Sequence, residues 1–163
     1  MNLLDIFRRK ERAPQQKELV SEKPDSKLMR AALKRVVIPE LRRRGFVGTF
    51  PHFRRTIGER LAIMSFQFDK WGGGFTINLA VAPATGFTTR AGSFIPPDKL
   101  NAYYDTGPKT RINAGSDGST ASWFRFDRPS RSPSQDIYEE AAHEMVPLLA
   151  KAEEWYAQNT VAT

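Results

Sequence analysis

Five polar and aromatic residues in the middle of the sequence have the types expected of a small-ligand site. Gln67 and Asn78 lie in two alternating runs that flank three consecutive glycines, and Trp71 directly precedes those glycines. Arg111 and Trp123 follow in a later segment. Amides orient a ligand, a guanidinium binds an anion, and indoles stack on planar groups. The sequence therefore predicts a site for a small polar or anionic ligand at Gln67, Trp71, Asn78, Arg111 and Trp123.

A structural explanation of the same residues stays open. On two neighbouring strands, Gln67 and Asn78 can face solvent or pair across the strands, and the tryptophans can belong to the core. Periodicity does not distinguish a solvated sheet face from the floor of a binding site.

No catalytic signature accompanies these residues. The glycine run lacks both the GxxxxGK[ST] and the GxGxxG spacing and precedes a strand pattern, so it predicts a hairpin turn. His52 and His143 are the only histidines, and neither has a metal-binding spacing. A GxSxG nucleophile elbow is also missing. We therefore expect no catalytic residue, no metal and no cofactor. The sequence favours a non-enzymatic module that binds a ligand or interacts with a partner. An enzyme with an unrecognised active site is the alternative.

Aromatic and basic residues alternate in two further segments. Phe50-Pro-His-Phe-Arg-Arg55 and Trp123-Phe-Arg-Phe126 resemble sheet platforms that stack single-stranded bases, although the spacing of an RNA-recognition motif is absent. Inward-facing phenylalanines with outward-facing arginines explain the same pattern. Binding of RNA or single-stranded DNA is therefore the second function that the sequence suggests.

The net charge of +7 is distributed unevenly along the chain. Residues 1–44 hold 13 basic and 6 acidic side chains, whereas residues 134–163 hold 1 and 6. We expect these two parts to neutralise each other in part, which weakens the inference from a basic total to nucleic-acid binding. The chain has no cysteine, so disulfides, thiol nucleophiles and thiolate metal sites are excluded.

No apolar run reaches the roughly 20 residues of a membrane-spanning helix, and the N-terminus lacks a secretory-signal pattern, so we expect a cytoplasmic protein. Leu3, Leu4 and Phe7 lie beside Arg8-Arg-Lys10, as in short helices that lie on anionic membrane surfaces. A frayed start is the alternative, because helices of about two turns are marginal in water. Membrane-surface contact through residues 1–12 is a secondary hypothesis.

Helical and alternating patterns divide the chain into a flexible tail, residues 1–24, and a single α+β domain, residues 25–160. A short helix is predicted over residues 97–104, within a long loop. The other predicted elements are helices over residues 25–44 and 134–158, the second bent at Pro147, and strands over residues 46–55, 61–71, 75–82 and 119–127. Together they predict an antiparallel sheet of about four strands with two long helices packed on one face.

Alternation assigns the two faces of the central hairpin. One face carries only apolar side chains: Met64, Phe66, Phe68, Phe75, Ile77, Leu79 and Val81. The other carries polar ones: Ser65, Gln67, Asp69, Thr76 and Asn78. We expect the apolar face to pack on the helices and the polar face, with the long loop over residues 83–118, to be the functional side.

The order of several short segments is similar to that of a bacterial family catalogued as domain of unknown function 4304 (DUF4304). These segments are Leu33-x-x-Val-Val-Ile-Pro-x-Leu41, Gln67-Phe-Asp-Lys-Trp71, Phe75-Thr-Ile-Asn-Leu79, Thr110-Arg-Ile112 and Trp123. The resemblance covers roughly residues 26–127. It implies a small α+β domain in a bacterial cytoplasm, assigns no activity, and ranks four residues above the other polar ones: Gln67, Trp71, Asn78 and Arg111.

Overall fold

Helix α1 (Ser26–Arg43) is the first element of the computed structural model, which describes residues 24–112 and 123–159. Asp25 caps the helix, because its carboxylate accepts hydrogen bonds from two backbone amides of the first turn at 2.7 and 3.4 Å. The buried residues recur at helical spacing: Met29, Ala32, Leu33, Val37 and Leu41. The helix predicted in this segment is confirmed.

The single strand predicted over residues 46–55 is wrong, because two strands occupy that segment. β1 (Val47–Thr49) and β2 (His52–Ile57) pair in antiparallel fashion, and the chain reverses between them at Phe50 and Pro51. Proline has no backbone N–H to donate to a ladder, so a strand cannot run through this position in the usual way. The reversal makes β1 an edge strand of the sheet.

β3 (Arg60–Phe68) and β4 (Gly74–Pro83) form the predicted central hairpin and pair along its whole length. Their turn uses the glycine run. Gly72 and Gly73 have φ angles of 86° and 80°, a left-handed conformation that side chains disfavour. Both the hairpin and the assignment of the glycines to its turn are confirmed.

Within the described residues the main sheet has six strands, not about four: five in the order β1-β2-β3-β4-β7, and β8, which also pairs with β4. β7 (Lys109–Ile112) lies in the segment expected to be a loop, and it pairs with the middle of β4. β8 (Phe124–Arg125) pairs with the start of β4. β8 is the part of the strand predicted over 119–127 that the structure contains; residues 119–122 lie outside the described part.

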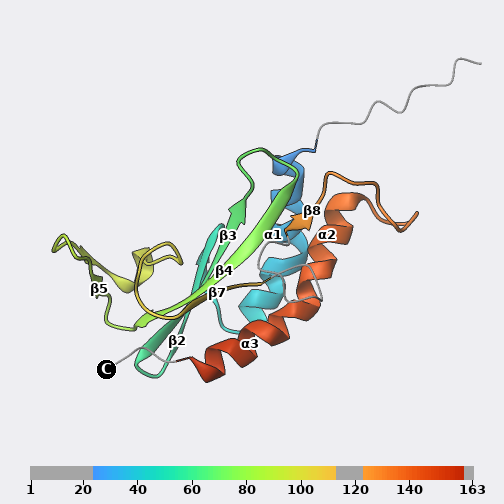
Figure 1. The fold of residues 1–163 in the computed structure, drawn as a ribbon. Helices are drawn as coiled ribbons and strands as arrows, with labels where there is room; N and C mark the ends of the chain where they lie inside the picture. Colours follow the sequence, from blue (N-terminus) through green and yellow to red (C-terminus); the bar gives the residue numbers. More distant parts are fainter. Residues whose placement is uncertain (1–23, 113–122, 160–163) are drawn as a thin grey trace, which may run out of the picture.

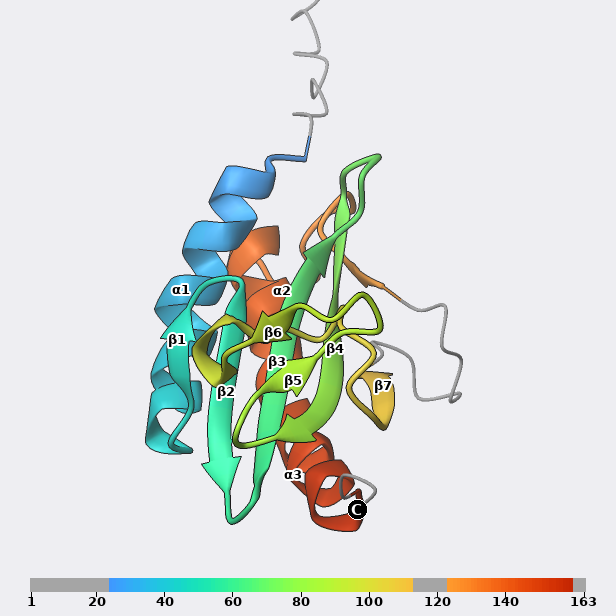
Figure 2. The ribbon, with the colours of Figure 1, turned by 90° about the vertical axis from the view of Figure 1, so that its left-hand side faces the viewer.

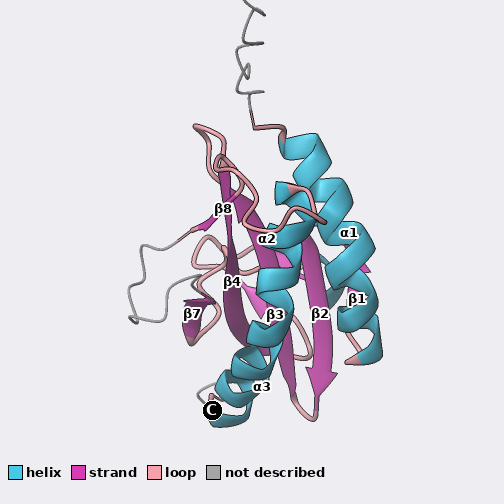
Figure 3. Ribbon diagram, turned by 90° about the vertical axis from the view of Figure 1, so that its right-hand side faces the viewer, coloured by secondary structure: helices cyan, strands magenta, loops and turns pink. Residues whose placement is uncertain are grey.

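The second predicted long helix is also wrong in detail. It is divided into α2 (Ile137–Met145), a 3-10 turn (Val146–Leu148) and α3 (Leu149–Gln158). Pro147 lies in the 3-10 turn, where the missing amide hydrogen interrupts the α-helical ladder as expected. α1, α2 and α3 cover the same side of the sheet (Figures 1 and 3), which we call the helix face.

The main core lies between these helices and the sheet. Six of the hairpin residues predicted to face the helices are at most 2% exposed: Met64, Phe66, Phe75, Ile77, Leu79 and Val81. Phe68, the seventh, is half-buried and packs against them. The predicted inward face of the hairpin is confirmed.

The opposite side of the sheet, which we call the outer face, is partly covered by residues 84–108 (Figures 1 and 2). This segment contains β5 (Phe87–Thr88), β6 (Phe94–Ile95) and a 3-10 turn (Pro97–Lys99), which is shorter than the helix predicted there. A second, smaller core fills the space beneath: Leu61, Ile63, Ala80, Ala82, Leu100 and Ala102. The outer face is therefore apolar towards the base of the hairpin and polar towards its turn.

The basic N-terminal part and the acidic C-terminal part of the chain meet in the fold, as predicted. Arg35 on α1 pairs with Glu139 on α2 at 2.9 Å. Glu153 on α3 lies 2.5 Å from Arg55 and 3.5 Å from Arg44. Part of the basic excess is therefore used in intramolecular ion pairs.

No helix in the described part of the chain is long and apolar enough to cross a membrane. The predicted tail and the membrane-contact hypothesis fall on residues 1–24, of which the structure describes only Pro24.

Candidate functional site

A row of polar residues crosses the outer face of the sheet from β2 to β7. His52 lies opposite Ser65, Ser65 opposite Asn78, and Asn78 opposite Arg111. Side chains at directly opposite positions have Cβ atoms about 5 Å apart and interact. Gln67, two residues after Ser65 on β3, extends the row, and we call these five residues the polar row.

Hydrogen bonds connect the members of the polar row. Asn78 Nδ2 donates to Gln67 Oε1 at 2.9 Å, and Arg111 Nε donates to Asn78 Oδ1 at 3.2 Å. The guanidinium carbon of Arg111 lies 5.6 Å from the ring centroid of Trp123, within cation–π distance. Four of the five residues predicted to bind a ligand thus form one continuous chain of contacts.

Trp71 is the predicted site residue that the structure does not bring to the others. Its side chain is 85% exposed at the tip of the β3–β4 hairpin. Its backbone N–H donates to Asp69 Oδ1 at 2.9 Å, and Lys70 Nζ lies 4.9 Å from its ring centroid. The tip of the hairpin projects beyond the sheet (Figure 1). The polar contacts of Trp71 in the described part of the chain are with Asp69 and Lys70, and not with the polar row.

Tyr103 borders the polar row, and the sequence did not predict it as a site residue. Its ring meets His52 edge-on at 5.9 Å. Burial raises the pKa of its hydroxyl, whereas the charge of Arg111 and a hydrogen bond with Asn78 lower it, and the net direction is upward. Tyr103 also lines a cavity of about 640 Å³ with Phe87, Thr88, Thr89, Arg90, Tyr104 and Asp105.

Trp123 lines a second cavity, of about 420 Å³, at the other end of the row. Gln67, Asn78 and Arg111 line neither of these two cavities. The predicted residues therefore form a connected strip between two hollows, and not the floor of one pocket.

His52 and Ser65 are within hydrogen-bonding distance, 2.9 Å between Nδ1 and Oγ, which invites comparison with a catalytic pair. Ser65 is fully buried, however, and its Oγ accepts the backbone N–H of Ala102 at 3.1 Å. Burial, followed by the charge of Arg54, lowers the pKa of His52, which favours the neutral form of the ring. A nucleophile must reach its substrate, and this serine instead fastens the covering segment to the sheet.

Replacing Ser65 with alanine is expected to lower the free energy of unfolding by about 1 kcal/mol, because the buried amide of Ala102 loses its acceptor. Hydrogen exchange at the Ala102 amide should accelerate more than exchange in the central strands. Thr88→Ala, an exposed change in the same covering segment, is the control. Unchanged Ala102 exchange in Ser65→Ala would contradict the role assigned to this hydroxyl.

Three of the four phenylalanines of the suggested base-stacking platform are buried, and the fourth, Phe50, is half-buried and packs against the core. Phe53 and Phe124 are fully buried, and Phe126 is 1% exposed. They belong to the main core beneath the helices. The inward-facing explanation of these two aromatic segments is the one that the fold supports.

Three residues of the site were not assigned from the sequence: His52, Ser65 and Tyr103. The information needed to find them differs. Alternation had already placed Ser65 on the polar face. Recognising His52 as its neighbour required the register of β2, and recognising Tyr103 required the path of a long loop.

Within the described residues, no group of three or more histidine, aspartate or glutamate side chains is arranged to hold a metal ion.

Comparison with known proteins assigns a family. Searches among curated proteins and among solved structures found no match. A family profile described as "Domain of unknown function (DUF4304)" matches residues 37–158, from within α1 to the end of α3. The match begins later than the sequence resemblance, which covers roughly residues 26–127, and extends past its end to include both C-terminal helices. Because this match covers most of the sequence, the chain belongs to the DUF4304 family.

Proposed function

We propose that this protein is a non-enzymatic binding module that recognises a small polar or anionic ligand through Gln67, Asn78 and Arg111 of the polar row, together with Trp123. The observation that supports the proposal is the continuous contact chain from Gln67 through Asn78 and Arg111 to Trp123. These side chains come from three strands and the segment before β8. Gln67, Asn78 and Arg111 lie on the outer face, and all four side chains are half-buried. Trp123 also lines the cavity that Glu144 and Leu148 border.

The chemistry of the row favours a ligand with a carboxylate or phosphate group. Arg111 is oriented on one side by Asn78 and on another by the Trp123 ring, so its guanidinium is held before a ligand arrives. An oriented guanidinium binds such oxyanions through paired hydrogen bonds. The rings of Trp123 and Tyr103 offer flat surfaces for an apolar or planar part of the ligand. A protein partner that presents a carboxylate would use the same groups.

Arg111→Gln is the variant that tests this proposal. With a panel of small carboxylates that starts with benzoate and glutamate, affinity is expected to fall about tenfold, the loss of one charge-assisted hydrogen bond. Isothermal titration calorimetry on the full chain measures the change, and thermal unfolding verifies that the variant folds. Lys109→Gln is the matched control, because it removes the same charge two residues away on β7.

Equal loss in Arg111→Gln and Lys109→Gln would indicate a general charge effect and reject the row as the site. Undiminished binding in Arg111→Gln would reject it as well. The bacterial and cytoplasmic setting that the family resemblance implies is part of the same proposal. Nucleic-acid binding is less well supported, because three of the four phenylalanines that suggested it are buried.

A further inference from the structure

The cavity beside Trp123 has the composition of an oxyanion site. It lies between β8, the loop after β8 and the 3-10 turn that precedes α3. Its lining contains three arginines and one glutamate beside apolar side chains: Trp123, Phe124, Arg125, Arg128, Arg131, Glu144 and Leu148. The guanidinium of Arg125 is paired with Asp127 and Asp69, so Arg128 and Arg131 are the arginines that concern the site. Arg111, the central residue of the proposed outer-face site, does not line it.

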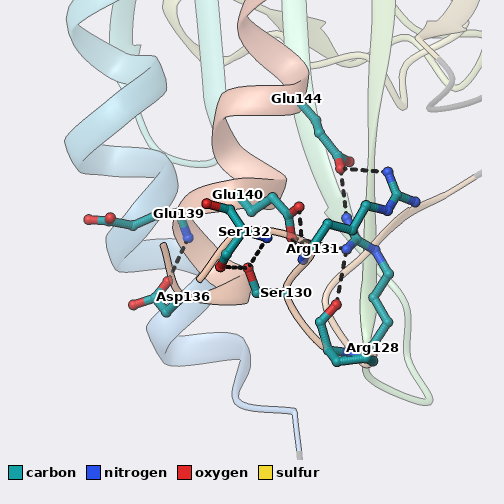
Figure 4. A network of polar contacts seen from close by, with 9 residues as sticks. Arg128, Ser130, Arg131, Ser132, Asp136, Glu139, Glu140 and Glu144 are labelled. Carbon is teal, nitrogen blue, oxygen red and sulfur yellow. Dashed lines mark hydrogen bonds and ion pairs between the residues drawn. The ribbon is translucent and has the colours of Figure 1, made fainter. Parts of the chain in front are cut away.

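Arg128 is held in place by two glutamates of α2 (Figure 4). Its Nη1 donates to Glu140 Oε2 at 3.0 Å, and its Nη2 donates to Glu144 Oε1 at 2.6 Å. Glu140 also accepts the backbone N–H of Arg131, at 3.1 Å to each carboxylate oxygen. The side chain of Glu140 is only 12% exposed. Its hydrogen bonds hold both Arg128 and the following loop against α2, so its role is structural.

Glu144 has a different position. Its carboxylate lines the cavity, binds Arg128 and lies 3.6 Å from Nη1 of Arg131. It therefore stands in front of two guanidinium groups, where the oxygens of an entering anion would otherwise lie. Arg131 is 75% exposed, and its structural contact with Glu140 uses only its backbone, so its side chain can turn towards a ligand.

We propose that this cavity binds an oxyanion carried on a flat apolar group, and that Glu144 competes with that anion for Arg128 and Arg131. Trp123 and Leu148 supply the apolar wall against which the flat group packs. The shared ligand chemistry is a carboxylate or a phosphate monoester. The two sites share Trp123, but their charged groups are different, so charge-removing variants distinguish them.

The test is a titration of the ¹⁵N-labelled full chain with phenyl phosphate, followed at the indole N–H signal of Trp123, which Trp123→Phe identifies. Phenyl phosphate should bind more tightly than inorganic phosphate, which lacks the ring, and than phenol, which lacks the anion. Benzoate, compared with phenyl phosphate, shows which oxyanion is preferred. Stronger binding of phenol than of phenyl phosphate would overturn the proposal.

Three charge-removing variants locate the binding. Glu144→Gln should tighten binding of phenyl phosphate about threefold or more, since a competing ion pair is removed. Arg131→Gln should weaken binding about tenfold, because a charge-assisted contact is lost. Arg35→Gln is the control, expected to stay within about twofold, because Arg35 is an exposed arginine paired with a different glutamate of α2.

Weaker or unchanged binding in Glu144→Gln would overturn the competition, and undiminished binding in Arg131→Gln would overturn the site. If Arg111→Gln weakens binding of phenyl phosphate and Arg131→Gln does not, the ligand binds at the polar row and not in this cavity. A third outcome would support two sites: Arg111→Gln abolishes binding of the carboxylates, and Arg131→Gln weakens binding of phenyl phosphate. The two proposals therefore fail in distinguishable ways.

Discussion

Phe124→Ala is expected to lower the free energy of unfolding by about 3–5 kcal/mol, the cost of emptying a buried aromatic site. Phe124 is fully buried, and its ring stacks on Phe75 with 4.9 Å between centroids and 13° between planes. β8 has only two residues, so the burial of this side chain is a large part of what holds it against β4. Urea denaturation measures the change.

The same experiment separates a core residue from a ligand-stacking one. A phenylalanine that stacked bases would be exposed in the free protein, and its removal would weaken RNA binding with little loss of stability. Phe94→Ala is the control, because its side chain is 60% exposed and its loss should change stability by no more than about 0.5 kcal/mol. Similar effects of the two substitutions would contradict the assignment of Phe124 to the core.

Glu153→Gln is expected to lower the free energy of unfolding by about 2 kcal/mol at pH 7. Arg55 donates to both carboxylate oxygens, at 2.8 and 2.5 Å, and its guanidinium carbon lies 4.6 Å from the centroid of Phe46. Arg44 approaches the same carboxylate at 3.5 Å. Removing the negative charge leaves two partly buried arginines side by side without their counter-charge.

This effect should depend on pH in a defined direction. Hydrogen bonds from Arg55 lower the pKa of Glu153; burial opposes them, and the charges of Arg55 and Arg44 add to the lowering. Near the unfolded-state pKa of about 4.3, the unfolded chain therefore binds more protons at this group than the folded chain does. The stabilisation is present above that pKa and is lost as the pH falls through the lower pKa of the folded state.

Urea denaturation of both proteins between neutral and acidic pH measures this dependence. The stability difference between the natural chain and Glu153→Gln should shrink as the pH falls below about 4.3. Glu139→Gln is the control, because the Arg35–Glu139 pair is more exposed and should contribute no more than about 1 kcal/mol. A difference that stays constant down to acidic pH would contradict the role of the Glu153 carboxylate.

The local elements were the most predictable part of this fold. α1, the β3–β4 hairpin and its glycine turn follow from short-range signals, namely a capping aspartate, alternation and glycines at positive φ. The apolar face of the hairpin was predicted residue by residue for the same reason. Errors concentrate where the outcome depends on distant partners, as in the division of the predicted strand into β1 and β2 and the pairing of β7.

The outer face shows why the candidate site was only partly predictable. The polar character of Gln67 and Asn78 follows from alternation, but the same face also carries Leu61 and Ile63, which need a cover. That cover comes from Leu100 and Ala102, some 40 residues further along the chain. Its path brings Tyr103 to the polar row, which no local pattern indicates.

The residue types alone established which chemistry is available. Amides, arginines and indoles lie in and after the central hairpin, and the chain has no cysteine. The tertiary structure decided which of them meet. Asn78 and Arg111 are 33 residues apart in sequence and become neighbours because β7 pairs with β4 in one register. A shift of that register by one residue would turn Arg111 to the helix face, because side chains alternate along a strand. Strand register arises from long-range pairing and packing, which residue spacing does not reveal. The sequence therefore predicted the residue types of the site. The fold brought four of the five predicted residues into contact and left Trp71 at the hairpin tip.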